Sequence, residues 1–288
     1  MAKYRQFNPE ELNLKEKHQL LLASVAPRPI GFTASKSIDG YINLAPFSYH
    51  NAFSSNPPVV GISPAYSGRT GEPKNTLTNI LATKEFTLSV VTYDMVEQMN
   101  ICAAEYGSDV DEFKKSGLSR HPSKSISIPG VAESPLIMEC RFLQHIQFSS
   151  EPAGGNLLLG EIIYFHARDD IYNKAGQIDP KKVDQVSRMG LNWYSRANQG
   201  IFDLPAPKFL PIGVDTLPQV VKDSSYFTGK LLARLAYIES IPKHNVSIDS
   251  KERYANCNGD ELLKACANLL ENNQIEEAWQ VLHLGKII

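Results

Sequence analysis

Lys74, Asn75 and Thr76 place a cation, an amide and a hydroxyl side by side at the expected start of a helix. The leucines and the isoleucine that follow have helical spacing, and Asn and Thr are favoured N-cap residues. A helix N-terminus offers free N–H groups and a partial positive charge, both of which attract phosphate. The trio therefore predicts a phosphate site. The alternative is that Asn75 or Thr76 only caps the helix and that Lys74 is only solvated.

A second group of candidate residues lies at 43–49, where the sequence reads N-L-A-P-F-S-Y. This region offers small hydroxyls and backbone donors that proline leaves unpaired, and Arg28 and Lys74 add two cations. The combination suits an anionic, planar ligand.

The elements that must position these residues can be predicted from proline, glycine and apolar spacing. The sequence A-P-R-P-I-G-F-T at 26–33 predicts a rigid turn that leads into a strand, because each proline restricts itself and its predecessor. Asp39 and Gly40 between alternating apolar runs predict a hairpin, and residues 59–63 predict a buried strand. A tight antiparallel meander would bring the hydroxyls and the cations together.

These blocks, in their order along the chain, resemble the flavin reductase-like family. No single block is specific, but the ordered set is. The matching blocks are P-R-P-I-G at 27–31, S-x-D-G at 37–40, N-L-A-P-F-S-Y at 43–49, S-S-x-P-P-V-V-G at 54–61 and K-x-T-L-x-N-I at 74–80. The resemblance covers roughly residues 20–197, and a weaker match continues at 224–229.

The resemblance implies a mainly β fold, a six-stranded antiparallel FMN-binding split barrel with peripheral helices, to which the residues after 202 are expected to add a helical C-terminal extension. It also implies non-covalent FMN, a homodimer with the flavin near the subunit interface, and hydride transfer from NAD(P)H to flavin N5. The cofactor carries that chemistry, so we assign no catalytic side chain. On this interpretation the protein is an NAD(P)H-dependent flavin reductase that could supply reduced FMN to a separate monooxygenase.

The resemblance and the local chemistry together predict a set of FMN-binding residues. We expect Lys74 and Thr76 at the phosphate, with Arg28 as a second cation or, alternatively, as a structural salt bridge that closes the barrel end. The full predicted set is Arg28, Ala45, Pro46, Phe47, Ser48, Tyr49, Asn51, Ser54, Lys74, Asn75 and Thr76.

The chain departs from the family pattern at three positions. Leu191 stands where the motif R-x-G-G-x-x-Y has its second glycine, which puts a close backbone approach there in doubt. His50 replaces a usual aromatic residue, and Asn75 replaces a frequent aspartate. None of these changes removes a cation or a hydroxyl from the predicted phosphate site.

Two other functions remain open at this point. One is a flavoredoxin-type electron carrier with tightly bound FMN, and the other is a non-enzymatic flavin-binding dimer that acts through its C-terminal helices. Rapid oxidation of a nicotinamide dinucleotide would favour the reductase. A truncation at Pro242 that spares flavin chemistry but abolishes capture of a partner would favour the non-enzymatic dimer.

Composition and motifs argue against several other classes. The 288 residues carry a net charge of −2, which offers no basic field for nucleic acid. The four cysteines lack C-x-x-C spacing and are expected to be reduced thiols, and no paired Cys/His metal spacing is present. A Rossmann glycine pattern and a G-x-S-x-G elbow are both missing. Residues 1–6 are polar, and no apolar run could span a bilayer, so we expect a cytoplasmic protein without a membrane partner.

Two domains are predicted, a flavin reductase-like barrel at 1–202 and a linker with a helical extension at 203–288. The prolines at 205–211 indicate an extended linker, and the spacing at 259–288 indicates a helical hairpin capped by Asn258 and Glu261. A two-helix unit cannot bury its apolar stripe alone, so we expect it to pack on the barrel or on a partner subunit.

Four further segments complete the prediction for the barrel domain. A helix at 12–22 is expected to cover one end of the barrel, and 106–129 is expected to be an excursion with a short helix near 111–116. Residues 135–148 and 156–167 are the longest strand candidates. The histidines on these elements, His18, His145 and His166, are interpreted as packed or surface residues rather than ligands, although His145 could reach a flavin if its strand faces the site.

Overall fold

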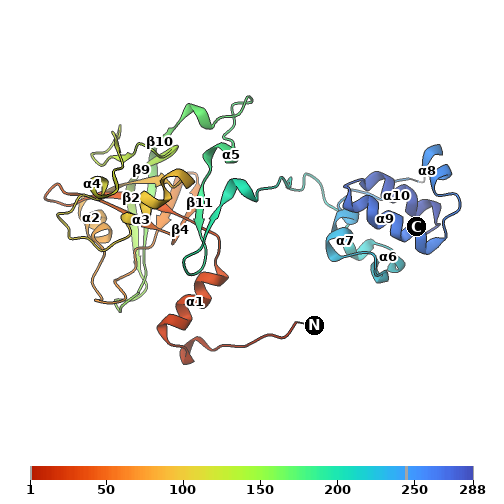
Figure 1. Cartoon of the computed structure of the whole chain (residues 1–288), viewed down its shortest axis with the longest axis horizontal. Coiled ribbons are helices and arrows are strands. Elements are labelled where there is room, and N and C mark those ends of the chain that lie inside the picture. The colour runs from red at the N-terminus through yellow and green to blue at the C-terminus, as the bar shows by residue number, and fades with distance from the viewer. Residues whose placement is uncertain (1, 244–245, 288) are drawn as a thin grey trace. The chain divides into compact units, whose positions relative to one another are not determined.

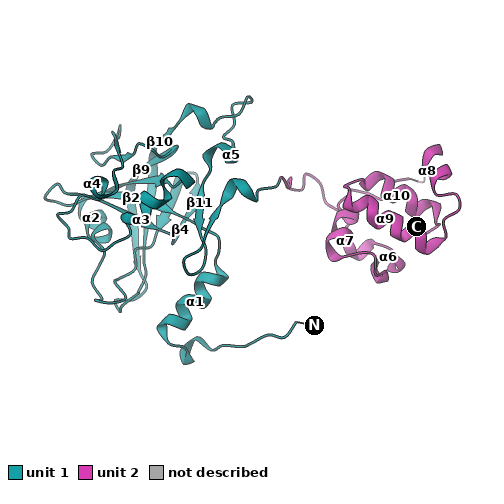
Figure 2. Ribbon diagram, in the orientation of Figure 1, with its two compact units in different colours: residues 1–202 teal, residues 203–288 magenta. Residues whose placement is uncertain are grey.

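The structure is a computed structural model that describes residues 2–243 and 246–287. The chain forms two compact units, residues 1–202 and 203–288 (Figures 1 and 2). Among the described residues, all of the sheets lie in the first unit, and the second unit consists of helices and connecting segments. Among the described residues, none of the helices is long and apolar enough to cross a membrane.

The first unit has five α-helices and twelve short and long strands among its described residues. Its helices are α1 (Leu14–Ser24), α2 (Asn75–Thr83), α3 (Val96–Ile101), α4 (Glu112–Ser116) and α5 (Pro180–Val183). Its strands are β1 (Arg28–Pro29), β2 (Gly31–Lys36), β3 (Ile42–Phe47), β4 (His50–Ser55), β5 (Pro58–Ile62), β6 (Glu85–Val90), β7 (Arg120–His121), β8 (Gly130–Val131), β9 (Leu136–Gln147), β10 (Asn156–Ala167), β11 (Val186–Arg188) and β12 (Tyr194–Arg196). Single 3₁₀ turns occur at Pro9–Glu11, Tyr93–Met95, Asp169–Ile171, Ala197–Gln199 and, in the second unit, Val214–Thr216.

The main sheet has seven antiparallel strands in the order β3-β2-β6-β9-β10-β5-β4. The two edge strands, β3 and β4, are consecutive in the chain and are joined only by Ser48 and Tyr49. So short a connection brings one end of the first strand beside one end of the last, and the sheet must therefore curve round. No β3–β4 pairing is present in the described sheet, so the barrel is split at this corner.

The prediction of six strands is wrong by one, and β4 accounts for the difference. Its residues are exposed apart from the half-buried His50, so the apolar alternation that marks a strand is missing. Pairing with β5 alone holds this strand in the sheet. Ser54 and Ser55, just before the double proline at 57–58, form the end of β4.

The predicted hairpin and the buried strand after it are confirmed. β2 and β3 pair from Gly31 opposite Phe47 to Lys36 opposite Ile42, and the turn is closed by a hydrogen bond of 3.0 Å from the N–H of Gly40 to the carbonyl of Ser37. Gly40 has a φ of +91°, which favours glycine. β5, which carries the predicted apolar run, is buried along four of its five residues.

The barrel core fills the space between the curved sheet and α2. Ile80, Phe86 and Leu88 have no exposed surface. Gly160 is required here, because a Cβ atom at this position of β10 would lie 2.4 Å from the ring of Phe86. A core closed this tightly gives the cavity-lining strands a rigid support.

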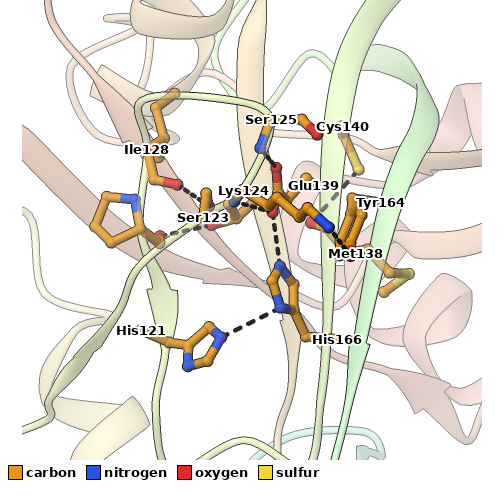
Figure 3. Close-up of polar contacts among 12 residues, drawn as sticks. His121, Ser123, Lys124, Ser125, Ile128, Met138, Glu139, Cys140, Tyr164 and His166 are labelled. Carbon is orange, nitrogen blue, oxygen red and sulfur yellow. Dashed lines mark hydrogen bonds and ion pairs between the residues drawn. The ribbon is translucent and has the colours of Figure 1, made fainter.

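The two longest strands occur where they were predicted, and a buried carboxylate ties the excursion to them. Glu139 on β9 is fully buried and accepts hydrogen bonds from the backbone N–H of Lys124 (2.6 Å) and Ser125 (2.7 Å) (Figure 3). His166 on β10 contacts the same carboxylate at 2.6 Å, and its other ring nitrogen lies 3.2 Å from His121. The second half of the 106–129 excursion is therefore anchored to the barrel wall.

Helix α1 does not cover the barrel as predicted. It has no buried residue, and Leu14 and Leu21 are each about half exposed. Figure 1 shows the helix extending away from the sheet of the first unit. A capping box between Asn13 and Glu16 stabilises the helix locally, so it does not need the barrel in order to form.

The second unit has its own apolar core. Its helices are α6 (Gln219–Asp223), α7 (Gly229–Ala236), α8 (Ile248–Arg253), α9 (Gly259–Glu271) and α10 (Ile275–Leu284). The predicted hairpin and its Asn258/Glu261 capping box are confirmed. Trp279 of α10 is fully buried and donates a hydrogen bond of 3.1 Å to the carbonyl of Leu235 in α7. The hairpin's apolar stripe is thus covered within its own unit, which corrects the expectation that it needs the barrel or a partner.

Candidate functional site

A cavity of about 600 Å³ lies in the first unit, beside the turn that joins β3 to β4. Its volume is in the usual range for a site that binds a small molecule or cofactor. Nine of the predicted binding residues line it, namely Arg28, Ala45, Pro46, Phe47, Ser48, Tyr49, Lys74, Asn75 and Thr76. Its wall is completed by loop 63–73, the segment 102–107 and Glu112 of α4.

Asn51 and Ser54, the two remaining predicted residues, do not line this cavity. Both are exposed on β4, and their side chains serve the local backbone. Asn51 Oδ1 accepts the N–H of Ala52 at 2.8 Å, and Ser54 Oγ accepts the N–H of Asn56 at 3.2 Å. A role for them in binding stays a prediction.

The N-terminus of α2 opens on the cavity without a side-chain cap. Lys74 is the N-cap residue and makes no capping hydrogen bond. Asn75 Nδ2 donates to the carbonyl of Tyr106 at 3.3 Å, and Thr76 Oγ1 accepts from Asn43 Nδ2 at 3.0 Å. Neither residue therefore caps the helix, contrary to the alternative drawn from the sequence. The first N–H groups of a helix have no partner within it, so they can serve a ligand.

Two cations and a carboxylate meet at this helix end. Glu105 lies 2.5 Å from Lys74 Nζ through one oxygen and 3.1 Å from Arg69 Nη2 through the other. The hydrogen bonds from Lys74 and Arg69 lower the pKa of Glu105 to about 2, so it is ionised at neutral pH. All three side chains line the cavity. This end of the cavity thus carries two cations and one carboxylate beside the N-terminus of α2.

Arg28 is held by the protein itself. Its Nη1 donates to the carbonyls of Leu22 (2.9 Å) and Val25 (2.6 Å), and its Nη2 donates to that of Met189 (2.8 Å). Its Nε lies 3.4 Å from Ser48 Oγ. Burial lowers the pKa of this guanidinium. No carboxylate of the described residues forms an ion pair with Arg28, so the alternative of a structural salt bridge is wrong. Arg28 joins α1 and the β11–β12 turn to the cavity.

Glu112 and Cys102 are two buried ionisable residues of the cavity wall. Glu112 is 3% exposed, and its carboxylate accepts the N–H of Leu44 at 3.0 Å. Burial raises the pKa of Glu112. Burial also raises the pKa of Cys102 to about 11, so its thiol is protonated at neutral pH and is a poor nucleophile.

Several lining residues were not predicted from the sequence. Arg69, Glu105 and Tyr106 belong to irregular segments with no periodicity or motif, and only the fold brings them to α2. Asn43 is the exception, since it opens the N-L-A-P-F-S-Y block and could have been included. His18 of α1 also lines the cavity, and it is exposed, as the sequence predicted.

The other histidines on the barrel are engaged outside the cavity. His50 Nδ1 lies 2.9 Å from the carbonyl of Gly61 on β5, and burial lowers its pKa. His145 Nε2 lies 2.9 Å from Asn156 Oδ1, and His166 contacts Glu139. None of these three is among the cavity-lining residues, so His145 does not reach this cavity. In the described parts of the chain, no group of three or more His, Cys, Asp or Glu side chains is arranged to hold a metal ion.

The segment 189–193 contains the position where the family pattern has glycine. Leu191 there has a φ of +52°, which is the left-handed region, and its side chain is 64% exposed. Trp193, two residues later, is 72% exposed. The turn thus keeps a glycine-like backbone with a large apolar residue in it.

Comparison with known proteins is consistent with this geometry. A family model described as the flavin reductase like domain matches residues 23–197. An uncharacterized protein of Halalkalibacterium halodurans is 35% identical over 205 residues, 69% of this chain and 95% of that protein. The crystal structure of nitrilotriacetate monooxygenase component B from Bacillus cereus is 30% identical, with a TM-score of 0.66 over 71% of this chain and all of that one. That of Pseudomonas fluorescens 2-nitrobenzoate 2-nitroreductase is 26% identical, with a TM-score of 0.63 over 72% of this chain and 98% of that one.

Proposed function

The chain belongs to the flavin reductase-like domain family, and from this premise we propose that its cavity binds FMN without a covalent bond. The observation that carries the proposal is the convergence of nine predicted residues on one cavity whose cationic end includes an uncapped helix N-terminus. A flavin mononucleotide has the matching parts, a phosphate and a planar ring. The binding residues proposed are the nine residues of the predicted set that line the cavity.

The chemistry of the cavity wall fits such a ligand in two regions. Lys74, Arg69 and the N–H groups of α2 offer charge and hydrogen bonds to a phosphate. The rings of Phe47 and Tyr49 and the hydroxyl of Ser48 offer apolar surface and a polar contact for the ring and the ribityl chain. Arg28 contacts Ser48 Oγ at 3.4 Å, and most of its other donors are used by backbone carbonyls.

The proposed activity is that of an NAD(P)H-dependent flavin reductase. Bound FMN supplies the hydride-accepting chemistry, so the protein's own task is to bind, orient and shield the two ligands. A monooxygenase component is among the similar structures, which supports delivery of reduced flavin to a separate monooxygenase. We assign no acid or base, and the buried thiol of Cys102 has no part in the reaction.

The proposal includes a homodimer with the flavin near the subunit interface. Large apolar side chains are exposed on α1 and on the 189–193 turn, both of which adjoin the cavity through Arg28. Exposed apolar groups that gather around a site are typical of an interface. Light scattering of the full chain tests this part of the proposal, and a monomer at working concentration would contradict it.

The test of the function is the visible absorption spectrum of the full chain after incubation with FMN and desalting. The spectrum is recorded without oxygen before and after NADH or NADPH is added. A retained flavin spectrum that bleaches rapidly supports the reductase and identifies the donor. A retained spectrum that does not bleach contradicts the reductase and favours an electron carrier. No retention, together with no oxidation of nicotinamide when free FMN is supplied, contradicts the FMN proposal.

A further inference from the structure

Glu105 occupies the place at which an anionic ligand would meet the cations of the cavity. One of its carboxylate oxygens lies 2.5 Å from Lys74, and the other lies 3.1 Å from Arg69. One side chain therefore forms an ion pair with both cations. A carboxylate and a phosphate compete for the same donors, since both are oxyanions that form charge-assisted hydrogen bonds. The cationic end of the cavity therefore already holds an anion that belongs to the protein.

The contacts of the surrounding backbone indicate that only the side chain of Glu105 would have to move when an anion binds. Asn75 Nδ2 holds the carbonyl of Tyr106 at 3.3 Å, and the N–H of Tyr106 bonds the carbonyl of Ala104 at 3.0 Å. The main chain on the C-terminal side of Glu105 is thus attached to α2. The Glu105 side chain is 42% exposed, and a glutamate has three rotatable bonds, so it can turn into solvent without any change in the loop.

We propose that Glu105 is an internal competitor for the phosphate of FMN, and that it sets how readily the flavin exchanges. This inference rests on the proposed function. When no ligand is present, Glu105 neutralises Lys74 and Arg69 and so removes their mutual repulsion beside the positive end of α2. When FMN enters, its phosphate replaces the carboxylate, and part of the binding free energy is used to break these two ion pairs. Weaker binding and faster release of the flavin follow.

The test compares FMN with riboflavin, which lacks the phosphate, in titrations of flavin fluorescence against the full chain and its Glu105→Gln variant. We expect the variant to bind FMN about two- to tenfold more tightly, because breaking exposed ion pairs carries a small cost. Riboflavin affinity should not change. The FMN affinity of the variant should also fall more steeply with salt than that of the wild type. In the wild type the phosphate replaces ion pairs that salt weakens as well, whereas in the variant it forms new ion pairs without breaking any.

The matched control is Glu72→Gln. Glu72 lines the same cavity, but it forms no ion pair with any residue that the structure describes. This variant removes an equal charge without releasing a cation, so its gain in FMN affinity should be smaller than that of Glu105→Gln. An equal gain in both variants would overturn the inference, because the effect would then be a general change in the field of the cavity.

The remaining outcomes separate the inference from the proposed function. Unchanged or weaker FMN binding by Glu105→Gln, with riboflavin still bound, overturns the inference alone, since Glu105 would then hold the cations in place rather than compete for them. A parallel change in FMN and riboflavin affinity also overturns it. If neither flavin binds to the native chain or to any variant, the proposed function fails, and the inference fails with it.

Discussion

Lys74 and Arg28 are both cations at the cavity, but their hydrogen-bond donors are used differently. Arg28 donates to three backbone carbonyls and contacts Ser48, which leaves one of its five N–H groups for anything else. The only hydrogen bond of the Lys74 ammonium to a described residue is to Glu105, and its side chain is 35% exposed. Lys74 can therefore change partner at little cost, whereas Arg28 cannot.

From this difference we predict the effect of Lys74→Ala. FMN affinity should fall about 10- to 100-fold, as for the loss of a hydrogen bond to a charged group, while riboflavin affinity and folding are retained. Fluorescence titration with each flavin and thermal unfolding measure these quantities. Unchanged FMN affinity would remove Lys74 from the phosphate site.

Glu139 carries the sharpest stability prediction at the scale of a residue. Burial alone would raise the pKa of Glu139, but the hydrogen bonds from Lys124 and Ser125 and from His166 together lower it below 4.5. A lowered carboxylate pKa contributes stability that is present above the unfolded-state value and is lost as pH falls through the folded-state value. Glu139→Gln should therefore lower the free energy of unfolding by about 2–4 kcal/mol at pH 7.

The difference between wild type and Glu139→Gln at pH 7 should narrow at an acidic pH below the lowered folded-state pKa of Glu139, because the wild-type carboxyl group is protonated there. Urea unfolding at the two pH values measures it. Glu85→Gln is the matched control, because the half-buried Glu85 accepts the N–H of Ser127 in the same loop at 3.4 Å through a hydrogen bond that is open to solvent. A difference that does not depend on pH would show that packing rather than charge explains the loss.

At the scale of the element, the turn that carries Leu191 keeps a left-handed backbone without glycine. That conformation costs a residue with a Cβ atom about 1–2 kcal/mol in the folded state. Glycine avoids this strain, but its greater freedom in the unfolded chain offsets part of the gain in stability. Leu191→Gly should therefore raise the free energy of unfolding by up to about 1 kcal/mol. Leu191→Ala, which keeps the Cβ atom, should give no gain in the same urea experiment. Equal effects of the two substitutions would assign the change to the exposed leucine side chain instead.

The β3–β4 corner shows how an element can create a site. The two edge strands of the barrel are joined by Ser48 and Tyr49 alone, and the cavity lies where they fail to pair. An unpaired sheet edge presents free backbone groups, which are usually a liability. Here the β3 edge is next to the cavity, and Glu112, which also lines the cavity, accepts the N–H of Leu44 on this strand.

At the scale of the whole molecule, each unit has its own apolar core, and the family match ends at residue 197, before the second unit begins. We predict that a fragment of residues 1–202 retains FMN binding and that a fragment of 203–288 unfolds cooperatively by itself. Calorimetry of the full chain should then show two transitions, of which FMN raises only one. Loss of flavin binding in the shorter chain would show that the second unit contributes to the site.

The sequence alone determined the local elements, because their causes are local. Alternating apolar residues, the Asp39-Gly40 turn and the Asn258/Glu261 capping box each act within a few positions, and the structure contains all three elements. The family resemblance identified the barrel because its blocks recur in order. Strand β4 could not be predicted in this way, since it is exposed and is held only by its neighbour β5.

The tertiary structure alone decided which charges meet. Arg69, Lys74 and Glu105 are separated by up to 36 positions in the chain, and no periodicity links them. The hydrogen-bond partners of Arg28 were also decided by the tertiary structure, because they lie on α1 and on the turn at Met189. An ion pair depends on distance in space, whereas a sequence pattern reports only spacing along the chain. Most of the proposed binding residues could therefore be named from the sequence, but the carboxylate of Glu105 beside Lys74 and Arg69 could not.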